Sequence, residues 1–156
     1  MDDKELRKFA LDLMTRTKVA FLATIDEEGL PQIRAIENLR NPDKFPHSSK
    51  IFIGYDDNFL VYVSTNTSSE KIKQIINNAN IAIYYCIPEE YKGVMIRGYA
   101  EIVDDLEIKK KIWIKRMKIY YPKGIEDPDF TLLRLIPNYI KGYYKLQKHI
   151  VDLRVK

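Results

Sequence analysis

Cysteine, histidine and long hydrophobic runs are scarce in this chain of 156 residues. The one cysteine, Cys86, has no partner for a disulfide and no second cysteine with which to build a zinc site. The two histidines, His47 and His149, lie far apart and fit no metal-ligand or catalytic-triad pattern. No apolar run approaches the ~18 residues of a membrane span, and the N-terminus does not resemble a signal peptide. We therefore expect a cytoplasmic protein that does not insert into a membrane.

The composition is that of a folded globular protein. Hydrophobic residues make up 46% and charged residues 31% of the chain. Its length is close to the ~150 residues of one domain, so we expect a single domain over residues 1–156. The net charge of +4 is partly concentrated in residues 109–118. This basic run is typical of a solvated helix face, and nucleic-acid binding is the weaker alternative.

Short β-prone segments dominate the pattern, and turn residues separate most of them. With only three expected helices, this pattern predicts a mainly β fold, a closed antiparallel β-barrel with peripheral helices, and argues against a βαβ fold. The segments expected to form strands are Val19–Ile25, Leu30–Ile36, Ile51–Tyr55, Phe59–Ser64, Ile81–Ile87, Val94–Val103, Phe130–Pro137 and Tyr139–Leu146, with residues 56–58 as the turn of a second hairpin.

Three helices are expected around the barrel. The first follows the capping pair Asp2 and Glu5 at the N-terminus. The second spans residues 68–78, after a capping box formed by Thr67 and Glu70. The third spans residues 105–121 outside the barrel, with Trp113 partly buried. The last ten residues are polar, and we expect them to lie on the surface.

A polar turn joins one predicted strand to the second helix. Hydroxyls of Thr65, Ser68 and Ser69, the free N–H groups of the helix start and the ammonium of Lys71 can all point toward a phosphate there. Serine and threonine also cap most helices, so the segment by itself is more typical of an ordinary helix start.

Arg34 strengthens the anion-binding interpretation. It lies among apolar neighbours on an early predicted strand, where an arginine either faces solvent or needs an anionic partner. One phosphate shared by Arg34, Thr65, Ser69 and Lys71 explains these residues better than separate coincidences do.

The chain resembles the FMN-binding split-barrel proteins related to pyridoxamine 5'-phosphate oxidase, particularly the general-stress-protein branch. The resemblance covers nearly the whole chain and depends on the order and spacing of several short motifs. These motifs are Ala20–Ile25 with Gly29, Pro31 and Arg34; Thr65-Asn66 with Ser69 and Lys71; Arg97–Glu101 with Asp104-Asp105; Trp113; and Leu132–Pro137.

The resemblance implies an antiparallel split barrel that works as a homodimer, with FMN at the subunit interface. It implies that the FMN phosphate is held by Arg34, Thr65, Ser69 and Lys71, and that the isoalloxazine ring is lined by backbone around Ala35, Ile36, Val63 and Ser64. Tyr143 and Tyr144 either touch the flavin or pack in the barrel.

The function implied is a flavin-dependent oxidoreductase acting on a small molecule, because FMN performs the chemistry and no acid-base pair stands out. The alternative is a protein that binds flavin, or haem or a deazaflavin, without turnover. Residues 147–150 do not match the C-terminal substrate motif of true pyridoxamine 5'-phosphate oxidases, so we do not expect that specific activity. The long loop 37–50, with Asn38, Arg40 and His47, could roof the substrate side.

Overall fold

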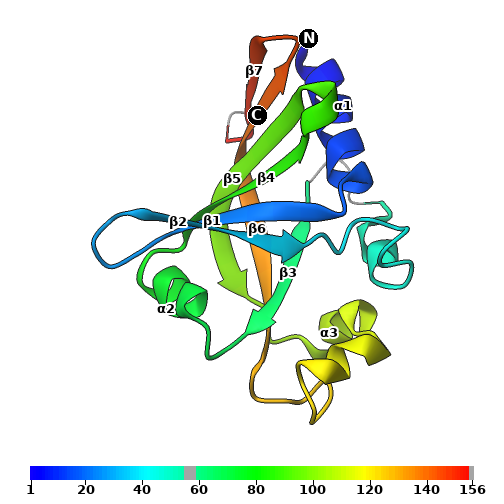
Figure 1. Cartoon of the computed structure of the whole chain (residues 1–156), viewed down its shortest axis with the longest axis vertical. Helices are drawn as coiled ribbons and strands as arrows, with labels where there is room; N and C mark the ends of the chain where they lie inside the picture. Colours follow the sequence, from blue (N-terminus) through cyan, green and yellow to red (C-terminus); the bar gives the residue numbers. More distant parts are fainter. Residues whose placement is uncertain (55–58, 155–156) are drawn as a thin grey trace.

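A strongly curled antiparallel sheet forms the body of the protein (Figure 1). The computed structural model describes residues 1–54 and 59–154. Within these ranges the strands are β1 (Val19–Ile25), β2 (Pro31–Glu37), β3 (Val61–Asn66), β4 (Asn80–Ile87), β5 (Lys92–Ile102), β6 (Phe130–Tyr144) and β7 (Gln147–Asp152).

The order of the strands leaves the barrel split. It runs β2-β1-β4-β5-β6-β3, with β7 paired to β6. The first half of β6 pairs with β3 and the second half with β7, while β5 pairs along almost its whole length. No ladder joins β2 to β3 in the described chain. The prediction of an antiparallel split barrel is confirmed. The closed barrel that the strand pattern suggested is not found in the described chain, because no hydrogen-bonded ladder joins β2 to β3.

A bulge in β5 helps to bend the sheet. The register against β6 shifts between Arg97 and Gly98. A Cβ atom on Gly98 would lie 1.8 Å from the carbonyl oxygen of Ile136, so only glycine fits at this point.

Three helices lie around the sheet, as predicted: α1 (Asp3–Arg16), α2 (Glu70–Asn77) and α3 (Leu106–Ile112). The capping box of α1 is confirmed, because Asp2 and Glu5 accept each other's backbone N–H. The residues that the structure describes also include the short 3₁₀ helices η1 (Ser48–Phe52), η3 (Pro88–Glu90) and η4 (Lys115–Ile119). In the described residues no helix is long and apolar enough to cross a membrane.

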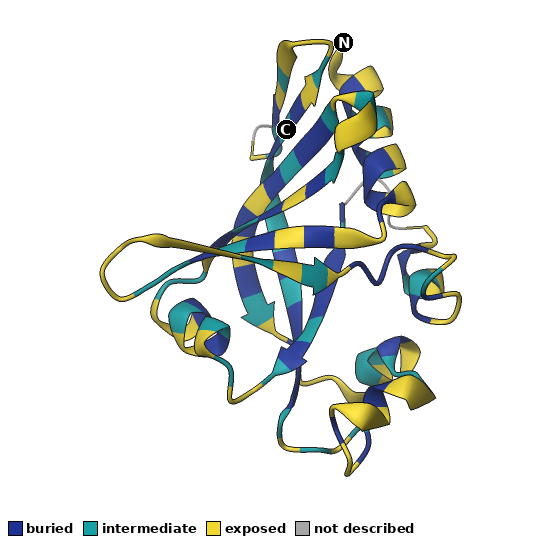
Figure 2. Ribbon diagram, in the orientation of Figure 1, coloured by how far each residue is buried: buried dark blue, intermediate teal, exposed yellow. Residues whose placement is uncertain are grey.

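Two apolar cores hold the elements together. Figure 2 marks the buried residues of these elements in dark blue. The main core fills the barrel under α1, which contributes Leu6, Ala10, Leu13 and Met14. The second core joins the loop after β2 to β3 and to the α3–η4 segment. Its buried members are Leu39, Phe45, Phe52, Tyr62, Val103, Ile112, Met117, Tyr121, Phe130 and Leu132.

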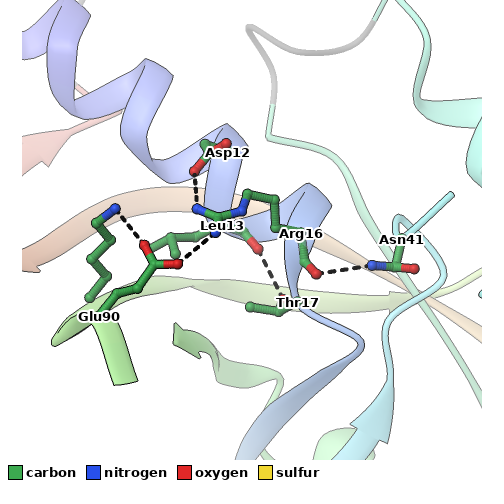
Figure 3. A network of polar contacts seen from close by, with 7 residues as sticks. Asp12, Leu13, Arg16, Thr17, Asn41 and Glu90 are labelled. Atoms are coloured by element: carbon green, nitrogen blue, oxygen red, sulfur yellow. Dashed lines mark hydrogen bonds and ion pairs between the residues drawn. The ribbon is translucent and has the colours of Figure 1, made fainter. Parts of the chain in front are cut away.

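A polar network fastens the C-terminal end of α1 (Figure 3). Arg16 forms ion pairs with Asp12 at 3.1 Å and Glu90 at 2.6 Å. Glu90 also pairs with Lys92 at 2.6 Å. Asn41 donates from Nδ2 to the carbonyl oxygen of Arg16 at 3.1 Å, so the same helix end contacts the loop that follows β2.

Two predicted elements differ because the second core shapes the chain. The strand predicted for Ile51–Tyr55 is wrong over the described residues 51–54, since η1 and a turn stand there and Phe52 is buried in the second core. The predicted hairpin turn, residues 56–58, lies outside the described residues. The predicted helix 105–121 is interrupted at Trp113 and Ile114, whose backbones are extended. Trp113 is partly buried as expected and packs edge-on against Phe130 at 5.2 Å between ring centroids.

Other differences concern a helix cap and the C-terminus. The N-cap of α2 is Ser69, not Thr67, whose hydroxyl instead donates to the carbonyl oxygen of Pro128 at 2.8 Å. The two strands predicted between Phe130 and Leu146 are one strand, β6. The last ten residues include β7, which buries Val151 in the main core and so is not merely surface chain.

Candidate functional site

A pocket of about 360 Å³ lies at the opening between the edge strands β2 and β3. Along such edges the strands offer backbone N–H and C=O groups that no further strand pairs. Its lining consists of Arg34, Ala35, Ile36 and Glu37 of β2; Ser64, Thr65 and Asn66 of β3; Lys71 of α2; Leu39 and Phe45; and Ile114, Arg116, Met117, Ile119, Tyr120 and Tyr121 around η4.

Arg34 is held against the inner side of β1 by neutral groups. Its Nη1 donates to Thr24 Oγ1 at 2.7 Å and to the carbonyl oxygens of Gln32 and Leu22 at 3.0 and 3.3 Å. Its Nη2 donates to Gln74 Oε1 at 3.2 Å. Burial lowers the pKa of Arg34, and the negative charge of Glu70 acts weakly in the opposite direction.

Lys71 brings a second cation to the pocket. Its ammonium donates to Thr65 Oγ1 at 2.8 Å. Burial lowers the pKa of Lys71, and repulsion from Arg34 lowers it further. In the part of the chain that the structure describes, no carboxylate forms an ion pair with Arg34 or Lys71. Glu37, the carboxylate in the lining, is paired with Lys44 at 2.5 Å. The lining therefore carries uncompensated positive charge.

The turn that carries these residues is fixed from the loop before β6. Asp129 accepts from Asn66 Nδ2 at 2.6 Å and from the backbone N–H of Ser68 at 2.8 Å. These hydrogen bonds lower the pKa of Asp129. The Ser69 hydroxyl is buried and has no hydrogen-bond partner among the described residues. Because buried hydroxyls are almost always partnered, this atom has an unmet need for a hydrogen bond.

Six of the eight residues predicted for the site lie in the pocket lining: Arg34, Ala35, Ile36, Ser64, Thr65 and Lys71. The structure thus brings together two segments that are thirty residues apart in the sequence. The side chain of Val63 is buried in the main core, which leaves only its backbone toward the edge of β3. Ser69 stands at the start of α2, two residues before Lys71, and does not contribute to the lining.

Sequence reasoning missed Thr24, Gln74 and the wall around η4. Thr24 is the polar member of the inward face that β1 forms with Ala20 and Leu22, and it is fully buried, so its need for a partner was a usable signal. Gln74 lies three residues after Lys71, on the same side of α2. Residues 114–121 give no signal of a pocket wall in the sequence, because their spacing predicts a continuous helix outside the barrel.

Other residues considered from the sequence lie outside the pocket. His47 is exposed near Lys50 and Lys111, and of the long loop only Leu39 and Phe45 line the pocket beyond Glu37. Tyr143 and Tyr144 do not contribute to the lining.

Cys86 is half-buried on β4. Burial raises the pKa of its thiol. Among the described residues, no group of three or more His, Cys, Asp or Glu side chains could hold a metal ion.

The family described as pyridoxamine 5'-phosphate oxidase matches residues 4–144 of the chain. The chain belongs to this family. Among curated relatives of this chain, General stress protein 26 of Bacillus subtilis (strain 168) is 26% identical over 158 residues, covering 99% of this chain and 100% of that protein. The pyridoxine/pyridoxamine 5'-phosphate oxidase of Rhizobium leguminosarum bv. trifolii is 33% identical over 86 residues, 55% of this chain but only 34% of that oxidase.

Solved structures agree with the pyridoxamine 5'-phosphate oxidase fold. A Clostridium acetobutylicum protein related to general stress protein 26 superposes with a TM-score of 0.76 at 27% identity, covering 99% of this chain and 98% of that one. A haem-binding protein from Mycobacterium smegmatis gives a TM-score of 0.68 at 14% identity, covering 96% and 58%. At that identity the second likeness concerns the fold alone.

Proposed function

We propose that the protein is an FMN-binding flavoprotein whose pocket between β2 and β3 holds the cofactor. The observation that carries the proposal is the pair Arg34 and Lys71, two half-buried cations in the pocket lining without a carboxylate partner in the described chain. The unpartnered hydroxyl of Ser69 belongs to the N-cap of α2, two residues before Lys71. An anion is needed to neutralise the pair, and a phosphate can also accept a hydrogen bond from a hydroxyl. Members of the family usually bind a flavin.

The residues present fit FMN from the phosphate to the ring. Arg34, Thr65, Ser69 and Lys71 would hold the phosphate, and the turn from Asn66 to Ser69 is already fixed by Asp129. Backbone around Ala35, Ile36, Val63 and Ser64 would line the ring at the two free strand edges. The pocket volume of about 360 Å³ falls in the lower part of the range typical of small-molecule sites.

We infer that the activity is that of a flavin-dependent oxidoreductase acting on a small molecule. Bound FMN would supply hydride or electron transfer, and the chain's own residues would bind and orient it. The wall around η4 would limit access from the opposite side of the pocket, where Tyr121 is buried and Tyr120 is exposed. Burial raises the pKa of Tyr121 to about 12, so its hydroxyl stays protonated at neutral pH.

We further propose that a second copy of the chain covers the outer face of the sheet. Ala35, Phe21 and Tyr84 form a row across β2, β1 and β4, and all three are exposed. Ile33 on the same face is 70% exposed. Exposed apolar groups gathered on one face are typical of an interface between subunits. Because Ala35 also lines the pocket, a partner on this face would lie next to the flavin site.

The cofactor is tested on the purified protein. We expect a yellow preparation with an absorption band near ~450 nm, from which acid releases FMN identifiable by mass spectrometry. A colourless protein that does not take up added FMN would contradict the proposal. Bleaching by NAD(P)H without oxygen would support the oxidoreductase. No bleaching would favour the binding protein without turnover or an enzyme with another electron donor.

A further inference from the structure

We propose that Gln74 and Thr24 are positioning residues that fix the guanidinium of Arg34 with neutral hydrogen bonds and so preserve its charge for a phosphate group. The inference depends on the proposed function, because it explains how the same site prefers a phosphorylated ligand to an unphosphorylated one. Neither residue needs to touch the ligand.

The hydrogen bonds of Arg34 differ in kind from those of three other arginines in the described chain. Arg16, Arg134 and Arg154 each form an ion pair with a carboxylate, at 2.6, 2.8 and 2.5 Å for their shortest contacts. All the acceptors of Arg34, in contrast, are carbonyl, amide or hydroxyl oxygens. Its guanidinium is therefore held by several hydrogen bonds without the neutralisation that an ion pair brings.

The polarity of the network follows from its chemistry. A guanidinium can only donate, so the side-chain amide of Gln74 must turn its oxygen toward Arg34. The Thr24 hydroxyl accepts from Arg34 at 2.7 Å and must then donate to Gln74 Oε1, which lies 2.5 Å away. The three side chains form a closed ring of hydrogen bonds, from Arg34 to Thr24, from Thr24 to Gln74 and from Arg34 to Gln74.

Two rigid elements hold the ring. Thr24 is fully buried on β1. Gln74 is placed by α2, which is anchored through Ile72 and Ile75, each 4% exposed in the main core. Since Lys71 is one turn earlier on α2, this helix carries both the second cation and the group that positions the first.

The absence of charge on the Gln74 side chain determines the preference for a phosphorylated ligand. A glutamate there has the same size and would accept the same hydrogen bonds, but it would pair with Arg34 and repel a phosphate. Glu70, the carboxylate that does act on Arg34, is exposed and lies outside ion-pair distance in the described structure. The structure thus keeps carboxylates away from this arginine while supplying four neutral acceptors.

The Gln74 side chain accepts hydrogen bonds that position Arg34, and it carries no charge that would neutralise Arg34. Gln74→Glu separates these two properties, because it keeps the hydrogen-bond acceptor and adds a negative charge. We expect this variant to weaken FMN binding by about 10- to 100-fold, while riboflavin binding stays within about threefold of the wild type. Thr24→Val, which keeps the shape and removes the hydroxyl, is expected to weaken FMN by about 3- to 10-fold. Asn77→Asp is the matched control, since it makes the same chemical change at an exposed position of α2. It should leave both affinities within about threefold.

Affinities are measured by flavin fluorescence titration of the apoprotein, and circular dichroism verifies the fold. Unchanged FMN affinity in Gln74→Glu would overturn the inference, as would equal losses for FMN and riboflavin or an equal effect of Asn77→Asp. If Gln74→Glu does not fold, the FMN-to-riboflavin ratio of Thr24→Val decides alone.

Inorganic phosphate separates this inference from the proposed function. Thermal stabilisation of the wild type by phosphate but not by FMN would remove the flavin proposal, and loss of that stabilisation in Gln74→Glu would still support the positioning role. A wild type that responds to neither ligand would overturn both.

Discussion

Arg34 and Lys71 approach the pocket from different elements, a strand edge and a helix, and each is anchored through a neutral oxygen. A charge-assisted hydrogen bond to phosphate contributes about 1.5–3 kcal/mol. We therefore expect Lys71→Ala to weaken FMN binding by about 10- to 150-fold, measured by fluorescence titration. Riboflavin, which lacks the phosphate, should be indifferent to the change. Equal loss of both ligands would show that Lys71 does not bind phosphate.

The stability of the Lys71→Ala apoprotein belongs to the same prediction. The substitution removes the hydrogen bond from the Lys71 ammonium to Thr65, which destabilises the fold. It also removes the repulsion between Lys71 and Arg34, which stabilises it, so the two effects oppose each other. The melting temperature should therefore change by only a few degrees. A large fall would mean that any loss of FMN reflects unfolding.

Lys71 also predicts how FMN binding depends on pH. Burial and Arg34 place its pKa below the ordinary value of 10.5. Only the protonated amine attracts phosphate, so the affinity for FMN should fall as the pH rises through that lowered pKa. Lys71→Arg keeps its charge in this range, and its affinity should hold to higher pH. An identical alkaline loss in both proteins would assign the titration to another group.

Local motifs made part of the site predictable at the level of single residues. Thr65, Ser69 and Lys71 stand within seven residues of one another, where a strand passes into a helix, and the chemistry of such a turn can be read from the sequence. Gln74 and Thr24 could not be paired in this way, since fifty residues separate them. Their contact depends on how α2 docks against β1, which no local pattern encodes.

Elements differ in how far tertiary contacts override their local pattern. The α1 helix appears as predicted, because its capping box and apolar stripe agree. Residues 105–121 have helical spacing, but the chain forms two short helices joined by extended backbone at Trp113 and Ile114. This arrangement buries Ile112 and Met117 in the second core and packs Trp113 against Phe130. Periodicity locates an apolar face but does not show whether the segment bends to bury it.

The network at the end of α1 should make stability depend on acid pH (Figure 3). Hydrogen bonds from Arg16 and Lys92 lower the pKa of Glu90 to about 2, below its ordinary value of 4.5. A carboxylate with a depressed pKa stabilises the fold above its unfolded pKa and loses that contribution as the pH falls through the folded pKa. The difference in unfolding free energy between the wild type and Glu90→Gln should be constant above about pH 5 and shrink toward pH 2.

Urea denaturation at a series of pH values provides the measurement for Glu90→Gln. Glu89→Gln is a suitable control, because this neighbouring carboxylate is exposed and forms no ion pair in the described structure. A difference for Glu90→Gln that stays constant down to pH 2 would show that the ion pairs do not lower its pKa in solution.

Among the described residues the sheet is open between β2 and β3, and this opening explains the location of the pocket. The antiparallel architecture follows from short β-prone runs and turns, so the fold class was predictable. The set of strands was not, because Ile51–Phe52 belongs to η1, the two strands predicted between Phe130 and Leu146 are one, and β7 was not expected. The opening between β2 and β3 was not, because strand pairing depends on contacts far apart in sequence. The β-prone pattern of the residues alone suggested a closed barrel, whereas the resemblance to a known family implied a split barrel.

The exposed face of the sheet predicts a dimer that one charge can disrupt. Burying a carboxylate without a partner in an apolar interface is costly, so Ile33→Glu should shift the protein from a dimer of twice 18.4 kDa toward a monomer of 18.4 kDa. Ile33 is 70% exposed in the single chain, so the substitution should barely affect the folded monomer. Light scattering after size-exclusion chromatography gives the mass.

Ile76→Glu is the matched control for this dimer prediction, because Ile76 is 68% exposed but lies on α2 and not on the sheet. It should remain a dimer. The monomeric Ile33→Glu variant should also bind FMN more weakly, since Ala35, two residues further along β2, joins the same face to the pocket. A wild type that is monomeric yet holds FMN tightly would contradict a shared site. A dimer unaffected by Ile33→Glu would place the subunit contact on another face.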